Sequence, residues 1–245
     1  MLKPLYLMLL ALLIAPVNAQ AADYAREKKW ADEVVPGVVV GDPVYLELAN
    51  SHKFLTLLTE ASPAKAAVIV VHGLGVHPDW GLIGVLRSQL ADLGYSTLSV
   101  QMPVLANEAT GEDYPVTFAE AAERLQHAAD FLRAKGYRKI AIVSHSMGSR
   151  MTHEYLGKHP NAPIAAWVAI GMGADVSYKA MKMPVLDLYG QNDLPQVLNG
   201  ARQRGDSLKG KAKSAQIVVP HADHFFENRD AELIRNVQTY LEKSL

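Results

Sequence analysis

Short runs of apolar residues alternate along most of this chain with longer segments in which apolar residues recur every three or four positions. Runs such as 67–71 and 140–143 are continuously apolar, as strands are when both faces of a mainly parallel sheet are covered. The first two runs are adjacent and partly alternating, which predicts an antiparallel hairpin at the sheet edge. We predict eight strands, over residues 43–49, 54–59, 66–72, 96–102, 139–144, 164–171, 184–189 and 215–219.

Helical spacing fills the stretches between these strands. Apolar residues recur at helical intervals over 82–93, 118–132 and 233–241, and a further helix is expected after residue 146. In residues 23–41 apolar residues follow neither the helical nor the strand period, so this segment is expected to be irregular. Strands and helices in unbroken alternation predict an α/β fold with helices on both faces of the sheet.

Signals for helix ends accompany two of the predicted helices. Gly94 and Gly136 stand where helix C-caps belong. Thr117, followed three residues later by Glu120, has the pattern of a capping box. These residues predict where the helices of 82–93 and 118–132 begin or end.

The first 21 residues form a separate segment. Lys3 precedes an apolar run over 5–17, and Ala19 and Ala21 offer cleavage sites with small residues at the −3 and −1 positions. We interpret 1–21 as a signal peptide and 22–245 as a single domain. The apolar run is shorter than the roughly 20 residues that span a bilayer, which argues against a permanent anchor. The mature protein is expected in the periplasm, or alternatively outside the cell, without stable membrane insertion.

Charge and composition exclude several classes of function. The chain has 245 residues, a formal net charge of −1 and no cysteine. Its near-neutral charge gives no global attraction to nucleic acid, so no nucleic-acid partner is expected. Without cysteine there are no disulfides, thiolate metal sites or Cys nucleophile. The His72/His77 and His221/His224 pairs have no third ligand at metal-site spacing, so neither a metal nor another cofactor is expected.

The segment 142–150, Ile-Val-Ser-His-Ser-Met-Gly-Ser-Arg, carries the strongest chemical signal. A buried strand runs into a small-x-Ser-x-Gly sequence centred on Ser146 and followed by a helical stretch. This pattern is typical of a nucleophile elbow, a tight strand-to-helix turn that lifts a serine hydroxyl above the sheet edge. The turn has space only for small residues two positions before and after the serine. Ser144 replaces the usual glycine there and is small enough for the turn.

Three further segments match the same architecture. Residues 68–75 end a strand in His-Gly, Asp193 follows a strand and a glycine turn, and His224 follows the last strand. The order Ser146, Asp193, His224 is that of α/β hydrolases, and each segment ends a predicted strand. From about residue 43 onward the chain therefore resembles the α/β-hydrolase superfamily. The resemblance implies a mostly parallel eight-stranded sheet and an esterase- or lipase-like serine hydrolase.

The resemblance also implies a role for each site residue. Ser146 is the nucleophile, His224 the general base, and Asp193 the acid that orients the imidazole. The backbone amides of Leu74 and Met147 form the oxyanion hole.

Other polar residues near these segments are given different roles. Asp175, which follows the preceding strand, is an alternative to Asp193, whereas Asp187 lies inside a strand and is a weaker candidate. His72 is expected to brace a loop, and His221 to be a loop residue.

The surroundings of this site bear on the substrate. Only residues 172–183 separate the sixth and seventh strands, too few for a lid domain, so the site is expected to be open. The loop 103–116 follows a strand end and should lie near the site. Leu74, Phe225 and Phe226 are candidates for an apolar acyl wall, although the two phenylalanines could equally seal the core.

Two flanking features are expected to be structural. In the run His-Pro-Asp-Trp at 77–80, Asp79 is expected to cap the following helix and Trp80 to pack beneath it. A solvated helix and turn are expected to carry a cluster of basic residues, namely Arg202, Arg204, Lys209, Lys211 and Lys213.

Together with the leader, the run at 77–80 resembles a group of exported bacterial α/β-hydrolase-like proteins. One hypothesis is an exported serine hydrolase that cleaves carboxylic esters, from small molecules or lipid-like substrates, through an acyl-enzyme. Acyl transfer to an alcohol is a variant of the same chemistry. The other hypothesis is a non-catalytic binding or envelope-maintenance protein with the same fold. The complete Ser-Asp-His set favours the enzyme, and the oligomeric state is left open.

Overall fold

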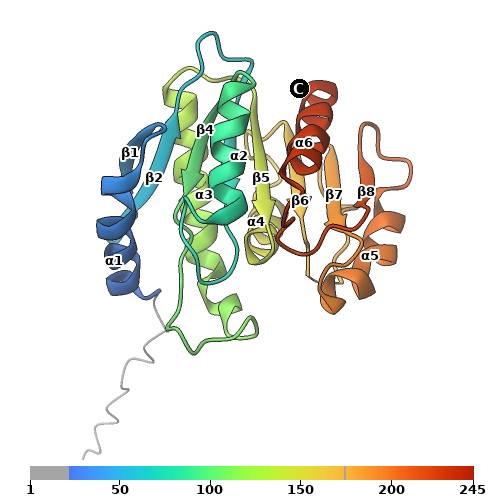
Figure 1. Ribbon diagram of the computed structural model, residues 1–245, viewed down its shortest axis with the longest axis horizontal. Coiled ribbons are helices and arrows are strands. Elements are labelled where there is room, and N and C mark those ends of the chain that lie inside the picture. The colour runs from blue at the N-terminus through green and yellow to red at the C-terminus, as the bar shows by residue number, and fades with distance from the viewer. Residues whose placement is uncertain (1–21, 174) are drawn as a thin grey trace, which may run out of the picture.

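The computed structural model describes residues 22–173 and 175–245, so the predicted signal peptide at 1–21 lies outside the described residues. All eight predicted strands form one sheet in the order β1-β2-β4-β3-β5-β6-β7-β8 (Figure 1). The strands are β1 (Asp42–Glu47), β2 (Lys53–Thr59), β3 (Ala66–Val71), β4 (Tyr95–Val100), β5 (Ile140–His145), β6 (Ala166–Ile170), β7 (Val185–Gly190) and β8 (Ala215–Val219). The helices are α1 (Tyr24–Val34), α2 (Gly81–Asp92), α3 (Phe118–Ala134), α4 (Met147–Lys158), α5 (Pro195–Leu208) and α6 (Asp230–Ser244), with 3-10 turns η1 (Val35–Gly37) and η2 (Tyr114–Thr117).

The sheet is mainly parallel, and its antiparallel part is the hairpin at one edge. β1 pairs with β2 and β2 with β4 in antiparallel fashion. The remaining strand pairs, from β4 across to β8, are parallel. Every residue of β3 and β5 is buried, which explains why these runs are almost wholly apolar. The predicted strand arrangement is confirmed.

Helices cover both faces of the sheet. On one face, α2 and α6 pack against Val68, Val70 and their neighbours, and on the other, α3 and α4 pack against Ile69. Successive residues of β3 thus enter different cores, as the two-residue period of a strand requires. The loops that follow the parallel strands emerge at one common edge, where ligands bind in open α/β sheets.

The connection from β6 to β7, residues 171–184, is short. Its described residues contain neither helix nor strand. Tyr178 and Met181 anchor it in the core beside α4. Within residues 22–173 and 175–245, no lid domain covers the carboxyl edge of the sheet. No helix within the described ranges is long and apolar enough to span a membrane.

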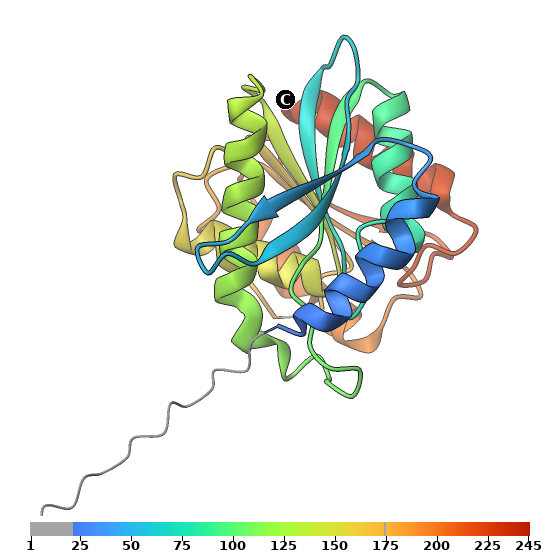
Figure 2. The same ribbon diagram turned by 90° about the vertical axis from the view of Figure 1, so that its left-hand side faces the viewer.

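The prediction that residues 23–41 are irregular is wrong, because α1 occupies Tyr24–Val34. The Asp23 side chain caps this helix by accepting a hydrogen bond from the Arg26 amide. Only Glu27 and Ala31 are buried along it, so its sequence has no apolar stripe. Glu27 instead pairs with Arg124 of α3, a contact between distant segments that periodicity does not report. Figure 2 shows α1 beside the β1–β2 hairpin.

Helix-end predictions are confirmed at the C-caps and wrong at one N-terminus. Gly94 and Gly136 have φ angles of +89° and +95°, the left-handed conformation that favours glycine. The Thr117 hydroxyl donates to the carbonyl oxygen of Tyr114, not to the start of α3. Glu120, the other member of the predicted capping box, forms an ion pair with Arg124. Other local partners, three and four residues away, thus replace those of the capping box.

Asp79 does not cap α2, contrary to prediction. Its carboxylate accepts a 2.6 Å hydrogen bond from Nε of Arg87, a buried residue within α2. Trp80 is the N-cap residue and makes no side-chain capping bond. The Trp80 ring lies edge-on to Phe225 at 5.5 Å between centroids, so it packs toward the loop after β8.

The predicted solvated basic cluster holds for Arg202, Lys209 and Lys213, which are exposed. Lys211 is half-buried and donates to the carbonyl oxygen of Met181. The prediction fails for Arg204, which is completely buried. Nε of Arg204 donates to both carboxylate oxygens of Asp187 at 3.0 and 3.1 Å. Tyr178 and Gln216 donate to the same carboxylate. A buried cation requires a charged partner, so Arg204 belongs to the core rather than to the surface.

Candidate active site

Ser146 lies at the turn between β5 and α4 with backbone angles of φ 56° and ψ −121°. This conformation is strained for a residue that carries a side chain. Gly148 makes the turn possible, because a Cβ atom there would lie 2.3 Å from the carbonyl oxygen of His72. The turn therefore has the form of a nucleophile elbow, with Ser146 at the carboxyl edge of the sheet.

Three loops bring Ser146, His224 and Asp193 into hydrogen-bonding contact. Nε2 of His224 lies 2.9 Å from Oγ of Ser146, and Nδ1 lies 2.6 Å from Oδ1 of Asp193. With the Nδ1 proton donated to the carboxylate, Nε2 is left to accept the proton of the serine hydroxyl. In sequence His224 is 78 residues from Ser146 and 31 from Asp193. The structure thus brings together the three residues that the sequence singled out.

The Asp193 carboxylate is buried but well supplied with hydrogen-bond donors. The amides of Leu194 and Gly190 donate to it at 2.8 and 3.1 Å. Burial acts to raise the pKa of Asp193, but the hydrogen bond and charge of His224, together with these amides, outweigh it and hold the pKa below its ordinary value. Asp193 is therefore ionised at neutral pH and can stabilise a positively charged His224.

The other candidate carboxylates do not reach His224. Asp175 is exposed in the β6–β7 connection, while Asp193 already bonds to the imidazole. Asp187 is buried in β7 and engaged by Arg204, as described above. The choice of Asp193 over Asp175 agrees with this geometry.

The loop after β3 borders the serine. A Cβ atom on Gly73 would lie 3.2 Å from the Cβ of Ser146, so the backbone of this turn lies close against Ser146. Met147 is the first residue of α4, where backbone amides lack an intrahelical acceptor and the helix dipole is positive. Both predicted oxyanion donors, the amides of Leu74 and Met147, thus belong to backbone that adjoins Ser146.

His72 braces this loop, as expected. Its Nε2 accepts a 2.8 Å hydrogen bond from the Met102 amide, and its Nδ1 donates to the carbonyl oxygen of Gly73 at 2.8 Å. Complete burial is the main cause that lowers the pKa of His72 to about 3. The ring is therefore neutral and joins the end of β4 to the turn beside Ser146.

His145 is a residue of the site that sequence reasoning missed. Its Nε2 donates to the carbonyl oxygen of His224 at 2.9 Å, and the centroids of the two rings lie 4.7 Å apart. Burial, followed by the nearby His224, lowers the pKa of His145 to about 4. In the sequence, only its position directly before Ser146 pointed to His145. In the small-x-Ser-x-Gly pattern that position is an x, where any residue is allowed.

Ser144 fits the elbow for a reason beyond its size. It is completely buried, and its Oγ accepts a 2.8 Å hydrogen bond from Nε1 of Trp167. The same Oγ lies 3.0 Å from the hydroxyl of Ser149, which in turn bonds to the carbonyl oxygen of Ile170. A serine therefore occupies the usual glycine position without leaving a buried polar group unsatisfied.

The predicted acyl wall divides into two parts. Phe226 is completely buried and seals the core, whereas Phe225 is 45% exposed and Leu74 is 37% exposed. Phe225 lies against His224, with ring centroids 5.1 Å apart. These two exposed side chains provide apolar surface next to the triad.

The loop 103–116 lies next to the site, as predicted. A Cβ atom on Gly111 would lie 3.4 Å from Cε of Met147 and 3.7 Å from Cδ1 of Leu74. Arg150 of α4 holds the loop by donating to the Gly111 carbonyl oxygen at 3.3 Å. The loop therefore forms one border of the opening to Ser146.

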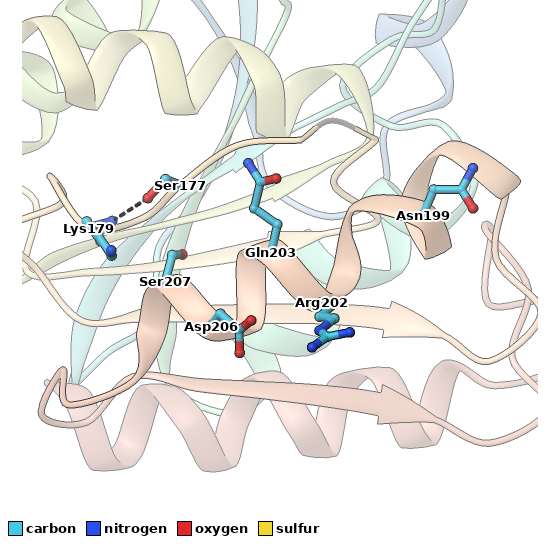
Figure 3. A pocket seen from close by; sticks show the side chains of 7 residues that line it. All are labelled: Ser177, Lys179, Asn199, Arg202, Gln203, Asp206 and Ser207. Carbon is cyan, nitrogen blue, oxygen red and sulfur yellow. Dashed lines mark hydrogen bonds between the residues drawn. The ribbon is translucent and has the colours of Figure 1, made fainter.

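A separate cavity of about 570 Å³ lies between α5 and the β6–β7 connection (Figure 3). The residues that line it all carry polar side chains, namely Ser177, Lys179, Asn199, Arg202, Gln203, Asp206 and Ser207. None of these residues forms or holds the triad, so the cavity is distinct from the candidate active site. Within the described part of the chain, no group of three or more histidine and carboxylate side chains could hold a metal ion.

One family model matches part of the sequence. It is described as a protein of unknown function (DUF3530), and it matches residues 42–121. This segment runs from β1 into α3 and includes the turn at His72, but it ends before Ser146. No curated protein matches the chain by sequence.

Solved structures that resemble this chain are α/β hydrolases. A dienelactone hydrolase from Anabaena variabilis has a TM-score of 0.66 at 20% identity, covering 83% of this chain and 99% of its own. Est1E from Butyrivibrio proteoclasticus has a TM-score of 0.65 at 12% identity, with coverages of 82% and 98%. A serine hydrolase without a lid from Xanthomonas campestris has a TM-score of 0.61 at 15% identity, with coverages of 85% and 96%. The chain therefore has the α/β-hydrolase fold without a lid domain, and the predicted fold class is confirmed.

Proposed function

We propose that this protein is an exported serine hydrolase that cleaves carboxylic esters through an acyl-enzyme intermediate. The observation that carries the proposal is the hydrogen-bonded series from Ser146 through His224 to Asp193, with distances of 2.9 and 2.6 Å. A serine hydroxyl is a weak nucleophile unless a base takes its proton, and this arrangement supplies the base and the group that orients it.

The reaction proceeds in two halves. In the first, Oγ of Ser146 attacks the acyl carbon while Nε2 of His224 takes the hydroxyl proton, and Asp193 stabilises the resulting imidazolium. The amides of Leu74 and Met147 bind the negative charge that develops on the carbonyl oxygen. The alcohol leaves with the proton from His224. In the second half, His224 takes a proton from water as the water attacks the acyl carbon. It then returns that proton to Oγ of Ser146 as the bond from Oγ to the acyl carbon breaks and the acid is released.

An open site and an apolar border suggest the kind of ester. No lid domain covers Ser146, and Leu74 and Phe225 offer exposed apolar surface beside it. Esters of small molecules, or lipid-like esters with a modest acyl group, fit an open site with this apolar border. The solved relatives named as dienelactone hydrolase and lidless serine hydrolase support hydrolysis as the reaction type.

The leader supports export. We interpret residues 1–21 as a signal peptide that is removed, and residues 22–245 as one domain that acts in the periplasm or outside the cell. N-terminal sequencing of the protein recovered from a periplasmic fraction tests this part, and a start at Gln20 or Ala22 is the expected result. An intact Met1 in the cytoplasmic fraction would contradict it.

The central experiment is covalent labelling of the mature protein with a fluorophosphonate, followed by mass mapping of the adduct. An activated hydroxyl should react, so we expect one adduct, on Ser146. The Ser146→Ala variant should take up no label, while Ser177→Ala, which removes an exposed serine, should label as the wild type does. A folded wild-type protein that takes up no label contradicts the proposal and favours the non-catalytic binding protein.

A further inference from the structure

A groove of about 470 Å³ runs between β8 and α6, remote from the triad. It begins at the amino end of β8, whereas His224 follows the carboxyl end of the same strand. Ala215 and Ile217 of β8 and Tyr240 of α6 form its apolar part. The groove is therefore a separate surface, and the proposed hydrolysis makes no use of it.

Three cations border the groove, and no acidic residue lines it. They are Lys213 before β8, and Arg235 and Lys243 on α6. Among the described residues, none of the three has a carboxylate within ion-pair distance, whereas Glu232 and Glu242 of α6 pair with cations elsewhere. In a chain with a net charge of only −1, this is a local concentration of unneutralised positive charge.

β8 is an edge strand (Figure 1). It pairs with β7 on one side and with no strand of the described chain on the other. The outward backbone groups along Ala215–Val219 can therefore accept another strand. A lysine near an edge strand, such as Lys213, commonly prevents unwanted strand pairing. Arg235 and Lys243 instead lie on α6 and line the groove, so protection of the strand edge does not explain them.

We propose that this edge binds an extended acidic segment of a partner protein as an additional strand. On a helix, Arg235 and Lys243 are eight positions apart, which at 1.5 Å per residue is about 12 Å. In an extended strand, residues four positions apart are separated by about 13 Å and lie on the same face. Two carboxylates spaced this way match the two cations.

The residue midway between the two carboxylates lies on the same face of the added strand. It would contact Ile217 and Tyr240, so an apolar side chain suits it. The partner segment therefore has the pattern acid-x-apolar-x-acid, which reads the same in both strand directions. Main-chain hydrogen bonds would supply affinity, and the two charges would supply specificity.

The test measures binding of a fluorescein-labelled peptide, Thr-Glu-Thr-Val-Thr-Glu-Thr, to the mature protein by fluorescence anisotropy. A peptide of the same composition, Glu-Thr-Thr-Val-Thr-Thr-Glu, moves both acids to the face opposite valine and is the matched control. We expect the first peptide to bind at least fivefold more tightly. Arg235→Ala and Lys243→Ala should each weaken its binding at least threefold, while Arg202→Ala, on α5, should leave it unchanged.

N-methylation distinguishes an added strand from simple charge attraction. Because alternate amides of an edge-bound strand face its neighbour, methylating one alternate set should abolish binding and methylating the other should not. Equal binding of the two unmodified peptides, or equal effects of both methylated sets, would overturn the proposal. So would binding of decanoate in the groove without peptide binding, which would identify a site for anionic amphiphiles. The Ser146→Ala variant should bind the peptide normally, so this result is independent of the proposed hydrolysis.

Discussion

The imidazole of His145 donates a 2.9 Å hydrogen bond to the main-chain carbonyl oxygen of His224. Since His145 directly precedes Ser146, this bond joins the end of β5 to the loop that carries His224. That loop contains His221, Phe226 and Asn228 with φ near +60°, a conformation that non-glycine residues rarely adopt. A loop of this kind keeps its form only when its surroundings hold it, and His145 is one of the groups that do so.

Replacement of His145 should therefore impair catalysis more than binding. We expect His145→Leu to lower kcat at least tenfold with little change in KM, because the loop loses its bond and His224 its position. His145→Gln keeps a donor near the place of Nε2 and should recover a large part of kcat. Steady-state kinetics on a soluble ester, with the pH profile of kcat/KM, would measure both. Equal kcat values for the Leu and Gln variants would exclude a role for the hydrogen bond.

Two buried histidines should make the fold sensitive to mild acid. The pKa values of His72 and His145 fall from 6.5 to about 3 and about 4, mainly because both rings are buried. Below pH 6.5 the unfolded chain binds these protons and the folded chain does not, so the free energy of unfolding decreases as pH falls. Each residue should cost about 2 kcal/mol between pH 7 and pH 5.

Urea denaturation at pH 7, 6 and 5 measures this loss. The His145→Gln variant removes one of the two groups, so its loss between pH 7 and pH 5 should be smaller by about 2 kcal/mol. Parallel pH dependences for the variant and the wild type would show that His145 does not titrate as described.

Substitution of Asp193 should affect catalysis, whereas substitution of Asp187 should affect stability. Asp193→Asn should lower kcat by roughly three to four orders of magnitude, because the amide no longer holds the His224 tautomer, with little change in stability. Asp187→Ala removes the buried carboxylate that pairs with Arg204 and should reduce the free energy of unfolding by about 3–5 kcal/mol. The exposed Asp175 provides the control, since Asp175→Ala should change neither quantity appreciably.

Denaturant unfolding and steady-state kinetics on the same samples would separate these effects. If Asp175→Ala lowered kcat as far as Asp193→Asn did, the triad acid would be misassigned.

Gly190 holds the loops of Asp193 and His224 in contact. A Cβ atom there would lie 2.3 Å from the carbonyl oxygen of Ala222, so Gly190→Ala should displace one loop and lower both kcat and the thermal midpoint. Gly157 of α4 is the matched control, because a Cβ atom there meets nothing within 4 Å. Gly157→Ala should keep full activity and stabilise the helix by up to about 1 kcal/mol. A fully active Gly190→Ala variant would contradict the close contact of the two loops.

Much of the fold follows from local patterns in the sequence. Continuous apolar runs identified β3 and β5, and the glycines at positions 94 and 136 identified helix ends, because burial and backbone conformation restrict residue type position by position. The small residues around Ser146 likewise indicated a tight turn, since that turn excludes larger side chains. α1 was missed because Glu27 and Ala31 are its only buried residues, so it has no apolar period to detect.

By itself, the sequence determined the α/β architecture and the order of Ser146, Asp193 and His224 along the chain. Only the tertiary structure decided that Asp193, rather than Asp175, bonds to His224, that Arg204 is buried against Asp187, and that His145 bonds to the loop of His224. These are contacts between loops and strands distant in sequence. Their geometry depends on how the sheet brings strand ends together. The local spacing of residues along the chain does not predict that arrangement.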